Sequence, residues 1–136
     1  MNSHKNKKNF KFDEAIDNQK EYPWSQSIDH CFIEGATIVN EVVFLHKESK
    51  TLIVTDLCLH ICKNSPFLTR VVFKAMGMFN RFGWSNLEKK IFISDKEKFY
   101  RSIDKILQWD FERVVLAHGV PIEANGKSLF SSAFKN

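Results

Sequence analysis

The stretch 41-EVVFLHKESKTLIVTD-56 contains two apolar runs separated by four polar residues. Runs rich in valine, isoleucine, leucine and threonine on either side of a short polar turn predict two antiparallel strands, 41–46 and 51–56, joined as a β-hairpin. Both runs are apolar at almost every position, which is typical of strands covered on both faces of their sheet. A further run, 113-RVVLAHG-119, predicts a strand over 114–117 that ends in histidine and glycine.

Helical patterns lie between the hairpin and this last strand. The segment 65-SPFLTRVVFKAMGMFNRF-82 begins with a serine–proline pair, which is typical of an N-cap followed by the first helical residue. A Ser-x-x-Glu capping box, 94-SDKE-97, predicts the start of a second helix. The apolar face of this second helix has helical spacing and consists of Phe99, Ile103, Ile106 and Leu107. A strand within 28–35 and a short helix over 127–134 complete the predicted elements.

These elements predict an α/β fold: a mixed or antiparallel sheet with helices on one face. A chain of 136 residues, with 43% hydrophobic and 26% charged residues, is typical of one soluble globular domain. We expect residues 1–21 to form a basic, loosely ordered segment and residues 22–136 to form the domain.

The net charge of +4 is concentrated near the N-terminus, at Lys5, Lys7, Lys8, Lys11 and Lys20. No arginine-rich pattern accompanies these lysines, which favours a solvated terminus over a nucleic-acid arm. No apolar run approaches the ~20 residues that span a bilayer, and residues 1–9 do not resemble a secretion signal. The three cysteines, Cys31, Cys58 and Cys62, lack framework spacing, which indicates reduced thiols in a cytoplasmic protein.

The geometry of the hairpin determines which polar residues can share a site. With a tight four-residue turn, His46 faces Thr51 and Glu41 lies opposite Asp56. His46 is then roughly 16 Å from Asp56, at ~3.3 Å per residue, and is expected to bond locally. Two carboxylates directly across a ladder repel each other. Glu41 and Asp56 are therefore expected either to share a cation, a metal ion or a proton, or to splay into solvent.

Other candidate donors lie at the ends of the strands. His118 precedes Gly119 at the end of a buried strand, where loops leave the scaffold and ligands often bind, although a lone histidine there is more often structural than catalytic. The cluster Cys58-x-His60-x-Cys62 carries donor atoms, but its spacing matches no standard zinc pattern. Its role is left open by the sequence.

The run 41-EVVFLHKESKTLIVTDL-57, followed after two helices by 109-WDFERVVLAHGVPIEANGK-127, resembles the metallo-β-lactamase-like fold. Within that fold it looks like a bacterial branch known only as a domain of unknown function. The resemblance covers about residues 22–134 and corresponds to the C-terminal half of an αββα sandwich. It implies that Asp56 matches the aspartate that bridges two metals in the family's hydrolases, and that His118 matches their last metal histidine.

The chain departs from those hydrolases in two motifs. It has no His-x-His-x-Asp-His segment, and in 35-GATIVN-40 Ala36 stands where their middle motif has a histidine. A stable zinc site needs at least three protein ligands. Asp56 and His118 are therefore expected to be vestigial, with no cofactor unless a partner completes a zinc or iron site. The chain is interpreted as a non-catalytic or degenerate module; the alternative is the C-terminal half of a split metal-dependent hydrolase.

The predicted strands carry apolar residues on a face that the helices do not cover. In the complete sandwich this face packs against the sheet of the other half. Soluble monomers avoid large exposed apolar patches, so the cover is expected to come from a second copy, a separately encoded N-terminal half or the N-terminal segment. A homodimer or such a complex is predicted. Val43 and Val54, opposite each other in the hairpin, share one face and are candidates for this contact.

Overall fold

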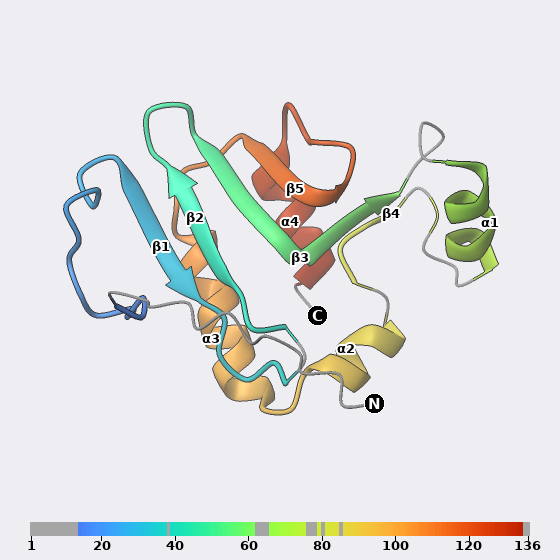
Figure 1. The fold of residues 1–136 in the computed structure, drawn as a ribbon, viewed down its shortest axis with the longest axis horizontal. Helices are drawn as coiled ribbons and strands as arrows, with labels where there is room; N and C mark the ends of the chain where they lie inside the picture. The colour runs from blue at the N-terminus through green and yellow to red at the C-terminus, as the bar shows by residue number, and fades with distance from the viewer. Residues whose placement is uncertain are drawn as a thin grey trace, which may run out of the picture.

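The computed structural model describes residues 14–37, 39–61, 66–75, 79, 81–84 and 86–134. In this part of the chain, one sheet has the strand order β1-β2-β3-β4, with β5 paired to β3 on its other side (Figure 1). All pairings are antiparallel except β3 with β5, which is parallel. The predicted α/β class with a mixed sheet is therefore confirmed. The elements are β1 (Ile28–Phe32), β2 (Val42–His46), β3 (Thr51–Ile61), α1 (Phe67–Ala75), β4 (Arg81–Phe82), α2 (Asn86–Phe92), α3 (Lys96–Leu107), β5 (Arg113–Gly119) and α4 (Gly126–Phe134).

The hairpin of β2 and β3 has the register that its turn length predicts. His46 lies opposite Thr51, and Phe44 lies opposite Ile53. His46 bonds within the turn, where its Nδ1 atom lies 2.7 Å from the Ser49 hydroxyl oxygen. Both the predicted pairing and the local role of His46 are thus confirmed.

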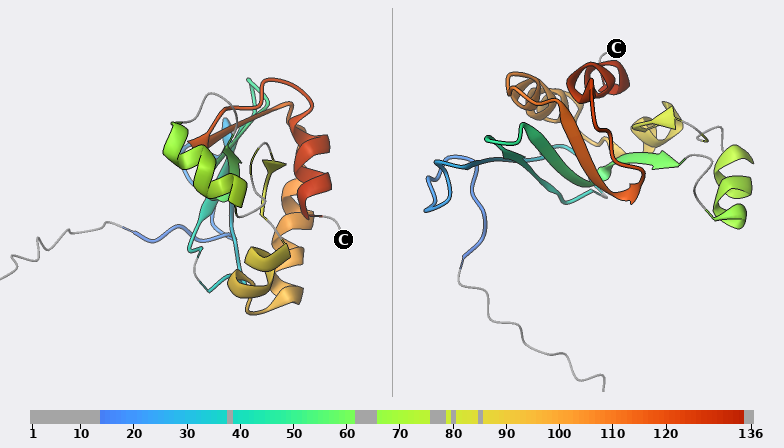
Figure 2. Two further views of the ribbon diagram at one scale, coloured as in Figure 1. Left: turned by 90° about the vertical axis from the view of Figure 1, so that its right-hand side faces the viewer. Right: turned by 90° about the horizontal axis from the view of Figure 1, so that it is seen from above.

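One face of the sheet packs against α3 and α4, which lie side by side above it (Figure 2). The predicted apolar face of the 94–107 helix is part of this core, with three side chains of α3 fully buried: Phe99, Ile103 and Ile106. Val43 and Val54 also belong to this core. These two positions therefore face the helices, so the expectation that they contact a partner was wrong.

The opposite face of the sheet carries apolar side chains that the helices leave uncovered. Phe44, Ile53 and Val115 are directly opposed across β2, β3 and β5 and therefore share this face. Ile53 is 39% exposed and Val115 is 44% exposed. We call the row Phe44, Ile53 and Val115 the open face. Strands with apolar residues on both faces were predicted, and the structure confirms them.

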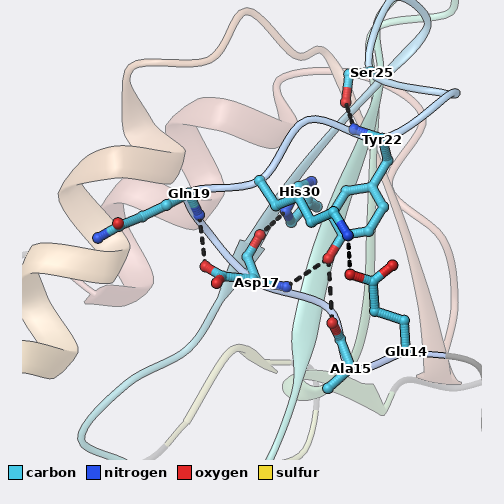
Figure 3. Close-up of polar contacts among 8 residues, drawn as sticks. Glu14, Ala15, Asp17, Gln19, Tyr22, Ser25 and His30 are labelled. Atoms are coloured by element: carbon cyan, nitrogen blue, oxygen red, sulfur yellow. Dashed lines mark hydrogen bonds and ion pairs between the residues drawn. The ribbon is translucent and has the colours of Figure 1, made fainter.

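Residues 14–25 fold against the β1 end of the open face. His30 lies opposite Phe44 in the ladder, and its Nε2 atom lies 2.8 Å from the Asp17 carbonyl oxygen (Figure 3). The Tyr22 ring packs edge-on against the His30 ring, with centroids 5.3 Å apart. The Tyr22 hydroxyl accepts the Asp17 backbone N–H at 2.8 Å. These contacts cover the β1 side of the sheet and leave the row defined above exposed.

Three features of the helical region differ from the prediction. The segment 65–82 is not one helix: α1 ends at Ala75, and Arg81–Phe82 pairs as β4 with the far end of β3. Ser65, its predicted N-cap, lies outside the described residues. The helix α2 was not predicted, because its few apolar side chains remain largely exposed. None of the described helices is long and apolar enough to cross a membrane.

The N-cap of α3 is Asp95 rather than the predicted Ser94. The Asp95 carboxylate accepts the Lys98 backbone N–H at 3.1 Å, and this bond lowers the pKa of the carboxyl group. Ser94 is occupied elsewhere, because its backbone N–H and its hydroxyl both donate to the Gly35 carbonyl oxygen. The close approach of the Gly35 loop therefore moves the helix start by one residue.

Candidate functional site

The site is created by an irregularity in β3. Pairing with β5 runs in register to Val54 opposite Leu116, and it resumes at Leu59 opposite His118. Residues 55–58 of β3 therefore face Ala117 alone, so the chain must leave the regular ladder. Figure 1 shows the resulting sharp bend within β3. The predicted strand ended at Asp56, whereas the observed strand continues to Ile61 beyond the bend.

Glu41 accepts hydrogen bonds from the backbone N–H groups that lose their ladder partners at this bend. Its carboxylate accepts the backbone N–H groups of Thr55, Asp56 and Leu57, with distances of 2.9 Å to the Asp56 nitrogen and 2.7 Å to the Leu57 nitrogen. The residue is only 4% exposed. A buried carboxylate needs such hydrogen bonds, and backbone donors released from a ladder need an acceptor. The Glu41 carboxylate is thus a structural acceptor for the backbone.

The two carboxylates expected to oppose each other do not meet as a repelling pair. Glu41 turns into the protein toward the backbone, while the Asp56 side chain points outward and is 62% exposed. Neither a shared metal ion nor a shared proton is needed to hold them. Of the two expected alternatives, splaying into solvent holds for Asp56. Neither alternative describes Glu41, because the amide groups of the bend provide its partner.

Trp84 binds the backbone carbonyl of Asp56 at the same bend. Its indole Nε1–H donates to the Asp56 carbonyl oxygen at 3.0 Å. The ring is buried and stacks on Phe99, with centroids 5.6 Å apart. Asp56 thus has its N–H bound by Glu41 and its C=O bound by Trp84. This role of Trp84 was not predicted, although a tryptophan in an apolar environment usually requires a hydrogen-bond partner.

The structure brings together Asp56 and His118, the two residues that the resemblance matches to metal ligands. The His118 Nε2 atom lies 3.2 Å from the Asp56 Oδ1 atom. His118 is 59% exposed, so both side chains are accessible to solvent. Exposed ion pairs contribute about 0–1 kcal/mol to stability, so this contact does not explain why the bend is formed. The pair is instead a consequence of the backbone arrangement that Glu41 and Trp84 hold.

Gly119 is the position where β5 returns to β3. Its φ is +128°, and a Cβ atom there would lie 2.1 Å from the His60 carbonyl oxygen. Only glycine permits this approach. The glycine of the Ala-His-Gly sequence is therefore explained by the pairing of the two strands next to His118.

Gly119→Ala is expected to lower the free energy of unfolding by about 2–4 kcal/mol, because the methyl group would collide with backbone in a strained conformation. Urea unfolding followed by tryptophan fluorescence measures this loss. Ala117→Ser, an exposed substitution two residues earlier on β5, is the control and should change stability by less than about 0.5 kcal/mol. An unchanged unfolding midpoint for Gly119→Ala would contradict the steric explanation.

The remaining donor cluster does not extend the site. The His60 Nδ1–H donates to the Val120 carbonyl oxygen at 2.8 Å. Cys58 is fully buried, and burial together with the nearby Glu41 raises the pKa of its thiol, which disfavours the thiolate that binds metals. Cys62 lies outside the described residues. Ala36 forms a bridge to Ile93 and packs against the core.

The donor set around Asp56 and His118 does not fit a complete metal centre. Within the described residues, no group of three or more histidine, cysteine, aspartate or glutamate side chains is placed to hold a metal ion. A zinc site requires at least three protein ligands, and Glu41 is already occupied by three amide groups.

Comparison with known proteins places the chain in a family. No curated protein matches it. A family model described as "Domain of unknown function (DUF4336)" matches residues 4–83. These residues make up more than half of the chain, and they include Glu41, Asp56 and the complete hairpin. The chain therefore belongs to this family of domains of unknown function.

Proposed function

We propose that this chain is a degenerate metallo-β-lactamase-like module that binds a second protein layer on its open face and has no hydrolase activity of its own. The observation that carries the proposal is the pairing of Asp56 with His118 at a strand bend where a third metal ligand is lacking among the described residues. The two side chains satisfy each other, and the third carboxylate in the region, that of Glu41, is bound to backbone amides.

The layer arrangement supports the binding part of this proposal. One face of the sheet is covered by α3 and α4 (Figure 2), whereas the Ile53 and Val115 side chains, at the opposed positions on the other face, remain exposed. In a two-layered half of a sandwich, such a face is where a second sheet packs, at a distance of about 10 Å. A homodimer and a complex with a separate first half are the two occupants that suit this geometry.

The purified chain is expected to retain far less than one equivalent of zinc or iron after dialysis, because two ligands do not form a stable site. Elemental analysis of the dialysed protein tests this prediction. The double variant Asp56→Ala/His118→Ala is the matched control for metal bound elsewhere. Stoichiometric metal that is retained by the natural chain and lost from the double variant would contradict the proposal.

The alternative is the C-terminal half of a split metal-dependent hydrolase. It is favoured by one observation: the backbone of Asp56 is held on both sides, by Glu41 and by Trp84, which is the kind of fixed position that a metal ligand requires. A second chain carrying a His-x-His-x-Asp-His segment would then supply the missing ligands. Co-purification with such a chain, followed by metal analysis, distinguishes the two functions. Metal binding by the complex that is lost in Asp56→Ala would support the split enzyme.

A further inference from the structure

A second candidate site lies away from Asp56, between α2 and the first turns of α3. Here a cavity of about 230 Å³ is lined by six side chains: Asn86, Lys89, Lys90, Ile93, Lys96 and Tyr100. Figure 1 shows α2 next to the start of α3, well separated from the bend in β3. Half of the lining residues are lysines, so the lining of the cavity is basic.

These lysines lack compensating carboxylates. Among the described residues, no ion pair is formed by Lys89, Lys90 or Lys96. Other lysines of the chain do form ion pairs. The nearby Asp95 and Glu97 are bound to Lys98 and Arg101 respectively.

The environment of Lys89 adds a further positive charge. Its partial burial and the neighbouring Arg81 lower the pKa of its ammonium group. Clustered like charges destabilise a folded protein unless an anion neutralises them. The Lys89 ammonium group lies over the Phe134 ring, 5.9 Å from its centroid, so Lys90 and Lys96 are the lysines of the cavity left to receive an anion.

The walls of the cavity combine this charge with apolar surface. Ile93 is almost fully buried and forms part of the apolar lining, and the Tyr100 ring packs edge-on against Phe99 of the core. Drug-sized ligands occupy pockets of roughly 300–1,000 Å³, so a cavity of about 230 Å³ suits a smaller molecule.

We propose that this cavity binds a small phosphate monoester, with Lys90 and Lys96 at the phosphate and the organic group against Ile93 and Tyr100. A phosphate monoester carries a charge of about −1.5 to −2 at neutral pH, which matches a site with several ammonium groups better than a monocarboxylate does. Lysine is a common phosphate ligand that acts as a point charge. This inference is independent of the function proposed for the open face.

The test uses the full chain and two probes, inorganic phosphate and phenyl phosphate, added at constant ionic strength while amide shifts are followed by NMR. Saturable shifts are expected in the segment from Asn86 to Tyr100. Phenyl phosphate is expected to bind more tightly than inorganic phosphate, because its ring can contact the apolar wall. Shifts that rise linearly without saturation would overturn the proposal, as would equal binding of benzoate.

Lys90→Gln/Lys96→Gln is expected to weaken phenyl phosphate binding about tenfold. Lys105→Gln/Lys127→Gln is the matched control, because it removes the same charge from α3 and α4 outside the cavity. The control should bind as the natural chain does. An equal loss of affinity in both double variants would show that the phosphate responds only to net charge, and would overturn the site.

Discussion

Glu41→Ala is expected to lower the free energy of unfolding by about 3–5 kcal/mol. The substitution removes the acceptor for three consecutive backbone N–H groups at the bend of β3, in a place that is almost closed to water. Hydrogen bonds to charged groups contribute about 1.5–3 kcal/mol each, and an unsatisfied buried donor costs a comparable amount. The expected loss is smaller than the sum because water enters the space that the side chain leaves. It still amounts to a large part of a typical stability of about 5–15 kcal/mol.

Two neighbouring variants make this prediction specific. Glu41→Gln keeps the size of the side chain but offers one acceptor oxygen instead of two, so a loss of about 2 kcal/mol is expected. Asp56→Ala changes the adjacent, exposed carboxylate and should alter stability by less than about 1 kcal/mol, since its own amide is bound by Glu41. Urea unfolding measured by fluorescence compares all three. The structural role of Glu41 is wrong if Asp56→Ala is the more damaging change.

The structural role of Glu41 could not be predicted from the sequence. The turn length was enough to predict the hairpin register, and that register places residue 41 near residue 56. The register says nothing about side-chain direction at an irregular position. The bend arises because residues 55–58 face a single residue of β5, and that depends on a partner strand distant in the sequence. Glu41 was therefore predicted as a repelling neighbour when it is the acceptor that holds the bend.

The fold was predictable where a pattern is long and regular. Helix α3 shows its buried face as helical spacing, and the strands around the core show continuous apolar runs. The elements that were missed are short or depend on distant partners. The two residues of β4 form a strand only because β3 extends past its bend and offers an edge. The resemblance implied that Asp56 and His118 match metal ligands, but residue spacing alone did not predict their contact.

The two faces of the sheet illustrate a further limit. Nearly continuous apolar runs indicate burial on both sides, but they do not reveal which alternate positions face the helices. Because side chains alternate with a period of two, a shift of one residue exchanges the faces completely. The pair Val43 and Val54 lies under the helices, and the pair Phe44 and Ile53 lies on the open face. The proposed contact with a partner therefore involves Phe44 and Ile53 rather than Val43 and Val54.

We expect the chain to associate through the open face, and Ile53→Lys or Val115→Lys to raise the dissociation constant on the order of a hundredfold or more. Burial of the Phe44, Ile53 and Val115 side chains against a partner would stabilise the assembly, at ~25 cal/mol per Å² of apolar surface removed from water. Association costs are estimated at ~4–15 kcal/mol or more, and they limit the net affinity. A single lysine ammonium placed in the contact is then sufficient to reverse the balance.

The measurement is the molar mass by light scattering at micromolar concentration, with far-ultraviolet circular dichroism as the check on folding. Ile53→Lys and Val115→Lys should give folded monomers. Val54→Lys, one residue from Ile53, should instead unfold, because Val54 lies in the core beneath the helices and cannot accept a charge. Gln108→Lys adds the same charge at an exposed position on the helical side and should leave the assembly intact. A natural chain that is already monomeric would refute self-association through this face, and dissociation by Gln108→Lys would place the contact on the helical side instead.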